Sequence, residues 1–141
     1  MNYYFAYGSN LNHTQMKRRC PKCRYIKKII LNNFQLTFRH RKGGWADIER
    51  KINGKVYGGL YIISKCAENR LDKYEDYPVL YKKIYFKYGD KKVMTYTMVR
   101  KTGFVYPSTR YLNIIKQGYK DCKISFKILN KALSHLKHIK E

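Results

Sequence analysis

Two short segments carry the residues that are suited to chemistry in this chain. The first is an apolar stretch, Tyr3–Tyr7, that runs directly into the turn-forming sequence Gly8-Ser9-Asn10. A strand that ends in such a turn leaves backbone N–H groups free to hold an anion. The second segment places Glu75 among several tyrosines. A loop that holds an anion and a carboxyl that is shielded from water are sufficient for proton transfer on a small molecule, so the two segments predict an enzyme.

Glu75 is the candidate acid and base because of its position relative to Leu71. The two residues are four apart, so they share one face if the segment is helical. Leu71 is expected to point inward, which draws Glu75 toward the core at the end of the helix, among Tyr74, Tyr77 and Tyr81. Partial removal from water raises the pKa of a carboxyl and lets it accept and release a proton near neutrality.

The charges that flank Glu75 leave a second interpretation open. Asp76 follows it directly, and a neighbouring negative charge raises the pKa of a carboxyl further. Lysines such as Lys73 and Lys82 are also close in sequence. In the alternative interpretation Glu75 forms an ion pair with one of them and has no part in chemistry.

Hydrophobic periodicity and turn residues predict the elements that position these segments. The predicted strands are residues 3–7, 25–31, 34–38, 46–51, 55–63, 82–88 and 91–99, and the predicted helices are residues 12–19, 65–77, 109–118 and 126–136. Asn32-Asn33, Asn53-Gly54 and Gly89-Asp90 are expected to form hairpin turns, and Asn-Gly is the strongest of these signals.

Cap residues set the expected ends of the helices. Asn12 or Asn10 is expected to cap the first helix, and Ser64 and Ser108 are expected N-caps of the next two. Pro78 is expected to end the helix that Ser64 begins, and Gly118 the helix that Ser108 begins. Several hairpins with a few helices predict an α+β fold, in which a small mixed sheet curls into a partial β-barrel with flanking helices.

Length and composition favour a single domain that spans residues 1–141. The chain has 44% hydrophobic and 16% aromatic residues, which is sufficient for a core, and only three prolines. The start of the sequence lacks the basic and apolar regions of a signal peptide, and no apolar run is long enough to span a membrane. We therefore expect a cytoplasmic protein.

The formal net charge is +22, from 31 Lys+Arg against 9 Asp+Glu. This excess is compatible with a polyanionic partner such as nucleic acid. The basic residues are scattered through every predicted element, however, and scattered lysines usually solvate a surface. Weak nonspecific binding of nucleic acid at low salt is the expected consequence.

The four cysteines do not predict a metal site or a disulfide framework. Cys20 and Cys23 have the spacing of half a zinc site, but such a site needs four ligands, and Cys66 and Cys122 are isolated. Without a secretion signal, these residues are expected to be reduced thiols.

Taken in order, several segments resemble the γ-glutamylcyclotransferase family, including its AIG2-like relatives. They are Phe5-Ala6-Tyr7-Gly8-Ser9-Asn10-Leu11, Gly44-Trp45-Ala46-Asp47-Ile48, Val56-Tyr57-Gly58-Gly59-Leu60-Tyr61, Leu71-Asp72-Lys73-Tyr74-Glu75, Tyr81, and Pro107-Ser108-Thr109-Arg110-Tyr111. The first motif followed by the Leu-Asp-x-x-Glu segment is the most specific part of the resemblance.

The resemblance implies an activity and roles for particular residues. A γ-glutamyl compound would cyclise to 5-oxoproline and release its amine, without a metal or an organic cofactor. Glu75 matches the acid/base carboxylate of the family. The backbone of the family loop would hold the α-carboxylate of the substrate, and two tyrosines would line the pocket; these positions match Tyr7, Gly8, Ser9, Asn10, Leu11, Tyr81 and Tyr111.

Two other functions remain open from the sequence. The same fold could remove a γ-glutamyl group from a biosynthetic intermediate or from a carrier protein, with the basic surface docking an acidic partner. Alternatively, the chain could be a noncatalytic basic module that binds nucleic acid, for which a change at Glu75 would have no effect.

Overall fold

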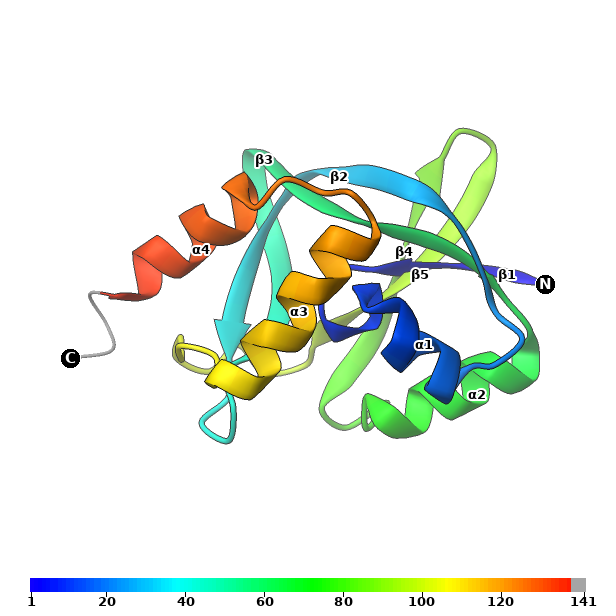
Figure 1. Cartoon of the computed structure of the whole chain (residues 1–141), viewed down its shortest axis with the longest axis horizontal. Coiled ribbons are helices and arrows are strands. Elements are labelled where there is room, and N and C mark those ends of the chain that lie inside the picture. The colour runs from blue at the N-terminus through cyan, green and yellow to red at the C-terminus, as the bar shows by residue number, and fades with distance from the viewer. Residues whose placement is uncertain (138–141) are drawn as a thin grey trace.

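A curled, mixed β-sheet with helices around it forms the frame of the molecule in the computed structural model, which describes residues 1–137 (Figure 1). The elements in chain order are β1 (Asn2–Ala6), η1 (Ser9–Leu11), α1 (His13–Arg19), β2 (Arg24–Arg39), β3 (Trp45–Ile63), α2 (Lys65–Tyr74), β4 (Tyr81–Tyr88), β5 (Lys91–Met98), α3 (Thr109–Asp121) and α4 (Lys127–Lys137). The α+β class and the small mixed sheet with flanking helices agree with the prediction. The single domain over 1–141 stays a prediction, since residues 138–141 lie outside the described part.

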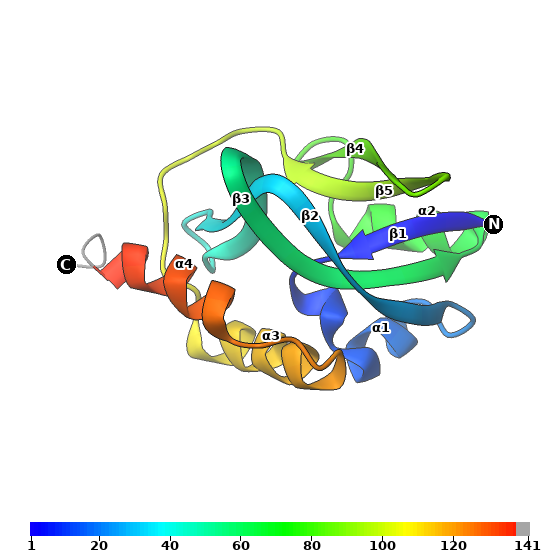
Figure 2. The same cartoon turned by 90° about the horizontal axis from the view of Figure 1, so that it is seen from above.

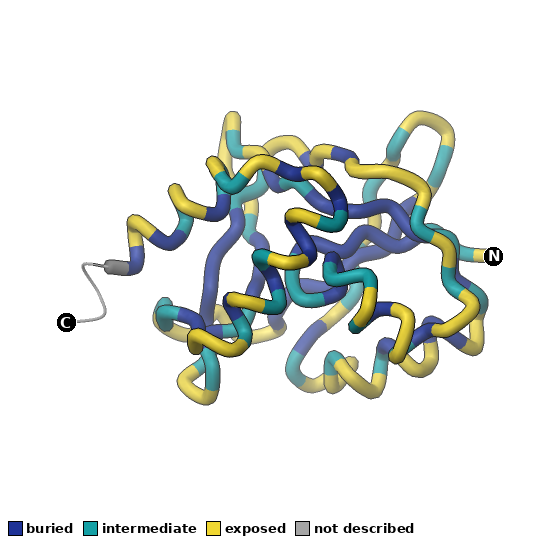
Figure 3. The backbone as a smooth tube through the Cα atoms, viewed as in Figure 1, coloured by how far each residue is buried: buried dark blue, intermediate teal, exposed yellow. Residues whose placement is uncertain are grey.

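The five strands are arranged in the order β2-β3-β1-β5-β4. β1 pairs in parallel with β5, and the other neighbouring strands are antiparallel. α1 and α3 lie together on one face of the sheet in both views (Figures 1 and 2). The buried part of the backbone runs through the strands at the centre, while the helices and the hairpin tips are largely exposed (Figure 3).

The predicted hairpins at Asn32-Asn33 and Asn53-Gly54 are wrong. β2 and β3 are each continuous, and they pair along their whole length as one long antiparallel ribbon. Asn33 and Asn53 have positive φ, 64° and 65°. The N–H of Asn53 donates a hydrogen bond to the Asn33 side chain at 3.1 Å. The register shifts at this point, so Asn-Gly forms a β-bulge, which requires the same backbone conformation as a turn.

The caps of the helices behave as expected at their N-termini. The side chains of Asn12, Ser64 and Ser108 each accept a hydrogen bond from the N–H three residues later, at the starts of α1, α2 and α3. The hairpin of β4 and β5 turns at Gly89-Asp90, as predicted. The C-terminal ends of α1 and of the last helix also fall within a residue or two of the predicted ends.

Gly118 does not end α3, contrary to the prediction. The helix continues to Asp121, and Gly118 packs against the backbone at the start of α1. A Cβ atom at this position would lie 2.5 Å from the Asn12 nitrogen. The glycine therefore serves the close approach of the two segments, which brings α3 against the loop at the end of β1.

Candidate active site

A cavity of about 300 Å³ opens at the carboxyl end of β1. Its lining comes from segments that are spread along the sequence from β1 to α3. It consists of Tyr4, Tyr7, Gly8, Ser9, Asn10, Gln15, Arg19, Trp45, Ala46, Tyr74, Glu75, Leu80, Tyr81, Tyr96, Tyr111 and Ile114. The volume is at the lower end of the range for small-molecule sites. All the residues predicted for the site lie here except Leu11.

The local structure explains why Glu75 faces this cavity. It is the C-cap residue of α2, and its N–H donates to Leu71 O at 2.9 Å, which keeps the two residues on one face. Leu71 is fully buried, and Glu75 is partly buried. The expected position of Glu75, at the helix end and turned inward, is what the structure has.

Burial raises the pKa of the Glu75 carboxyl from its ordinary value of 4.5 to about 7, against the opposing effect of the Arg19 guanidinium. Asp76 has no part in this shift: it adopts positive φ, 51°, and its exposed side chain lines a different groove. The ion pairs of the described residues do not include Glu75, so the alternative of a pair with Lys73 or Lys82 is wrong. A carboxyl with this pKa can both accept and donate a proton at neutral pH.

Arg19 is a residue of the site that sequence reasoning missed. Its Nη1 donates to Asn10 Oδ1 at 2.7 Å, and its guanidinium lies 4.5 Å from the ring centroid of Tyr74. Tyr74, one of the tyrosines expected around Glu75, is 58% exposed and lines the cavity. A basic residue in the last turn of a short helix is common, so no sequence signal marked Arg19.

The loop after β1 is fixed by buried polar contacts. The Asn10 side chain donates to the Tyr4 hydroxyl at 3.0 Å, and its backbone carbonyl accepts from Tyr61 at 3.2 Å. Leu11 lies in the core and its N–H donates to Gly8 O at 3.0 Å, so it is the one predicted loop residue that is not part of the cavity. The N–H groups at the start of a helical turn have no partner within the turn, which leaves those of Ser9 and Asn10 for a ligand.

Tyr81 and Tyr111 hold the backbone of one residue, Ala46, at the wall of the cavity. The Tyr81 hydroxyl donates to Ala46 O at 2.7 Å, and the Tyr111 hydroxyl accepts from Ala46 N–H at 3.0 Å. Burial raises the pKa of both phenols, so both remain protonated, although the Ser9 side chain opposes this larger effect at Tyr111. Tyr77, the third tyrosine expected around Glu75, does not line the cavity; the ammonium of Lys83 lies over its ring instead.

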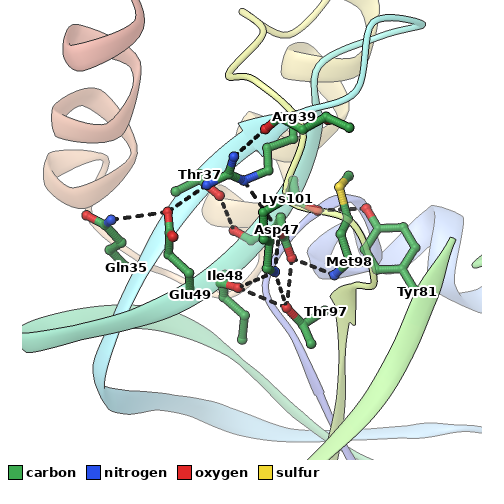
Figure 4. Close-up of polar contacts among 12 residues, drawn as sticks. Gln35, Thr37, Arg39, Asp47, Ile48, Glu49, Tyr81, Thr97, Met98 and Lys101 are labelled. Atoms are coloured by element: carbon green, nitrogen blue, oxygen red, sulfur yellow. Dashed lines mark hydrogen bonds and ion pairs between the residues drawn. The ribbon is translucent and has the colours of Figure 1, made fainter.

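The residue that follows Ala46 in the chain carries a buried carboxylate. Asp47 is completely buried and accepts from Met98 N–H at 2.8 Å, from Thr97 Oγ1 at 3.0 Å and from Lys101 Nζ at 2.6 Å (Figure 4). The guanidinium of Arg39 lies 3.8 Å away. These bonds join the first half of β3 to the end of β5, two strands that are not neighbours in the sheet, and thereby curl the sheet into the predicted partial barrel.

The described residues can also be compared with the predictions on metal binding, membrane spans, location and polyanion binding. Among residues 1–137, no group of three or more His, Cys, Asp or Glu side chains is placed to hold a metal ion, and no helix is long and apolar enough to cross a membrane. The cytoplasmic location and the weak binding of polyanions stay predictions.

Comparison with known proteins agrees with this architecture. The model of the family described as gamma-glutamyl cyclotransferase, AIG2-like, matches residues 4–119. A curated human protein, gamma-glutamylcyclotransferase, is 28% identical over 131 residues, which cover 84% of this chain and 70% of that protein.

Solved structures show the same fold. An uncharacterized protein from Homo sapiens superposes with a TM-score of 0.80 at 26% identity, over 93% of this chain and 85% of that chain. A structure described as gamma-glutamyl cyclotransferase superposes with a TM-score of 0.78 at 24% identity, over the same shares of the two chains. YkqA from Bacillus subtilis also gives 0.78 at 21% identity, over 99% of this chain and 55% of that chain. Since the family model matches most of the sequence, the chain belongs to the AIG2-like gamma-glutamyl cyclotransferase family and is an enzyme of that type.

Proposed function

We propose that the protein converts a γ-glutamyl amino acid or amine to 5-oxoproline and the free amine, with Glu75 as the general acid and base. The observation that carries this proposal is the position of a carboxyl with a pKa of about 7 in the same cavity as the loop Gly8–Asn10. A carboxyl that titrates near neutrality and faces a loop with N–H donors suits a reaction that moves one proton within an anionic substrate.

The reaction needs one proton to move from one nitrogen to another. The α-amino nitrogen of the substrate attacks the side-chain carbonyl carbon, so a new C–N bond closes a five-membered ring and the original amide C–N bond breaks. Glu75 accepts the proton that the attacking nitrogen loses and returns it to the leaving nitrogen. Because both reacting groups belong to one molecule, the main task of the protein is to hold the substrate in its folded, reactive pose.

The loop and its neighbouring cation would hold that pose. The N–H groups of Ser9 and Asn10 are the donors for the α-carboxylate of the substrate, and Arg19, which is bound to the Asn10 side chain, supplies a positive charge beside them. Burial of the Asn10 side chain between Tyr4 and Arg19 keeps the loop in one conformation.

Tyr111 is in a position to stabilise the negative charge that develops on the carbonyl oxygen. Its hydroxyl oxygen accepts the hydrogen bond from Ala46 N–H, so its own hydrogen is available to the substrate. Tyr111→Phe is expected to lower kcat by about 10²-fold, the effect of losing one donor to a developing oxyanion. Steady-state kinetics measure this loss. Tyr85→Phe, at a residue outside the cavity, is the matched control, and equal kcat for the two variants would refute the role of Tyr111.

The pKa of Glu75 predicts the acid limb of the pH profile. The base must be deprotonated to accept the proton, so kcat/KM is expected to rise with pH through an apparent pKa of about 7. Arg19→Gln should move this limb to higher pH, because the guanidinium lowers the pKa of Glu75. Measurement of kcat/KM from pH 4 to 9 tests both statements. A limb near 4.5 in the unmodified protein would contradict them.

The proposed reaction is tested directly by product analysis. The protein is incubated with γ-glutamyl amino acids, γ-glutamyl amines and glutathione, and 5-oxoproline and the released amine are quantified together. Equal amounts of the two products from at least one substrate are expected. A free amine with glutamate in place of 5-oxoproline would indicate hydrolysis, and the absence of 5-oxoproline from every substrate would overturn the proposal.

A further inference from the structure

A second depression borders the cavity and is the starting point of the inference. This basic groove, of about 920 Å³, lies between residues 40–42, the segment 79–80 and residues 98–102. It shares Trp45, Tyr74 and Leu80 with the cavity that holds Glu75, so the two meet along these three side chains. A substrate whose glutamyl head occupies the cavity has the basic groove as the nearest surface for its remaining part.

The charge of the basic groove is strongly positive. Arg41, Lys42 and Arg100 line it, all three are exposed, and none of them takes part in an ion pair among the described residues. Asp76 is the one acidic side chain in the described lining. By contrast, Lys83 and Lys101 each form an ion pair with a buried carboxylate, at 2.6 Å. Three cations and one carboxylate leave the basic groove with a net positive charge, which attracts an anionic ligand.

A stacked pair of aromatic rings forms part of the border of the groove. The imidazole of His40 stacks on the Trp45 indole with ring centroids 4.5 Å apart and an angle of 7° between the planes. His40 itself has positive φ, 85°, at the turn between β2 and β3. The stacked pair fixes the position of the turn that carries Arg41 and Lys42, and so places these cations next to the cavity.

We propose that the basic groove binds the leaving part of the substrate and selects γ-glutamyl peptides whose leaving residue is acidic. This inference rests on the proposed function. In such a peptide the residue released from the glutamyl group carries an α-carboxylate and a side-chain carboxylate, and these meet Arg41, Lys42 and Arg100. The bonds made and broken are those of the cyclisation itself: the leaving nitrogen receives the proton through Glu75, and no other reactant is needed.

Three substrates with the same glutamyl head distinguish the effect of charge on the leaving residue from the effect of its shape. They are γ-glutamyl-glutamate, its isostere γ-glutamyl-glutamine, in which the side chain of the leaving residue is uncharged, and γ-glutamyl-lysine linked through the α-amino group. The expected order of kcat/KM is glutamate over glutamine over lysine, with about a fivefold step between the first two at low ionic strength, because exposed charge pairs are worth up to about 1 kcal/mol. The step should shrink at 0.5 M salt, since salt screens exposed charges.

Variants of the groove show whether these cations cause the preference. The triple variant Arg41→Gln/Lys42→Gln/Arg100→Gln is expected to turn over γ-glutamyl-glutamate and γ-glutamyl-glutamine equally well. Its kcat/KM should fall further on γ-glutamyl-glutamate, which loses the partners of two carboxylates, than on γ-glutamyl-glutamine, which loses the partners of one. Arg24→Gln/Lys55→Gln/Lys87→Gln removes the same net charge from exposed strand positions outside the cavity and the groove, and should retain the fivefold preference.

The outcomes distinguish this inference from the proposed function. Equal kcat/KM for all three substrates would overturn the inference, but it would not contradict the proposed cyclisation. Equal losses of preference in the two triple variants would overturn it as well, because the net charge of the protein would then be the cause. Failure to form 5-oxoproline from any of the three would overturn the proposed function and the inference together.

Discussion

Glu75→Gln is expected to lower kcat/KM by about 10²–10⁴-fold, the usual contribution of general acid–base catalysis. Glutamine has the shape of glutamate but has no proton to exchange near neutrality, so the substrate still binds while the proton is no longer moved. Turnover of γ-glutamyl-glutamine at pH 7.5, followed by release of 5-oxoproline, measures the loss. Asp90→Asn is the matched control, because Asp90 lies in the exposed turn between β4 and β5, outside the cavity.

The same variant has an expected effect on stability that runs in the opposite direction. The folded pKa of Glu75 is about 7 and its ordinary value is 4.5, so the folded protein binds more protons than the unfolded chain between these pH values. The free energy of unfolding of the unmodified protein therefore falls as pH rises through this window. Glu75→Gln lacks this decrease, so it should be more stable relative to the unmodified protein at pH 8 than at pH 4.

Urea unfolding at the two pH values measures the difference. A variant that loses activity and gains relative stability at pH 8 is the signature of a catalytic group held in an unfavourable environment. A variant with full activity would contradict the proposed role of Glu75. A loss of activity accompanied by equal destabilisation at both pH values would instead indicate that Glu75 supports the fold.

Asp47→Ala is expected to lower the free energy of unfolding by about 3–5 kcal/mol, the cost of leaving a buried charge without its partner. Removal of the carboxylate leaves the Met98 N–H without its acceptor and takes from the buried Arg39 guanidinium one of its two carboxylate partners. Lys101 loses its partner as well. Chemical unfolding followed by circular dichroism measures the effect.

Glu49→Ala is the control for this second prediction. Glu49 also pairs with Arg39, at 2.9 Å, but its side chain is 28% exposed, so the cost of its removal is expected to be about 1 kcal/mol. Asp47→Asn retains an acceptor for Met98 N–H and removes only the charge, so its cost should fall between the two. Equal stabilities of the Asp47→Ala and Glu49→Ala variants would show that the network in Figure 4 does not hold the curled sheet together.

The Asp47 network also has an expected consequence for activity. Ala46, whose backbone N–H and C=O are held by Tyr111 and Tyr81 at the cavity wall, directly precedes Asp47 in the chain. The carboxylate and the site are thus positioned by the same segment of β3. Residual folded Asp47→Asn protein should therefore show a lower kcat on γ-glutamyl-glutamine, through displacement of the peptide unit that Tyr111 contacts.

Features that depend on a few adjacent residues were predictable from the sequence. The caps at Asn12, Ser64 and Ser108, the hairpin turn at Gly89-Asp90 and the inward position of Glu75 all follow from local hydrogen bonding and helical periodicity. The motifs in the segments from Phe5 to Tyr111 were also sufficient to identify the family, because their order along the chain can be read without a structure.

Other features were decided by the tertiary structure, because they depend on segments that are distant in the chain. Asn53-Gly54 specifies positive φ, but only the partner strand decides whether that residue forms a turn or a bulge. The entry of Arg19 into the cavity, the pairing of Asp47 with residues 97–101 and the pKa of Glu75 arise in the same way. A pKa responds to every group that displaces water around a carboxyl, and those groups come together only when the chain folds.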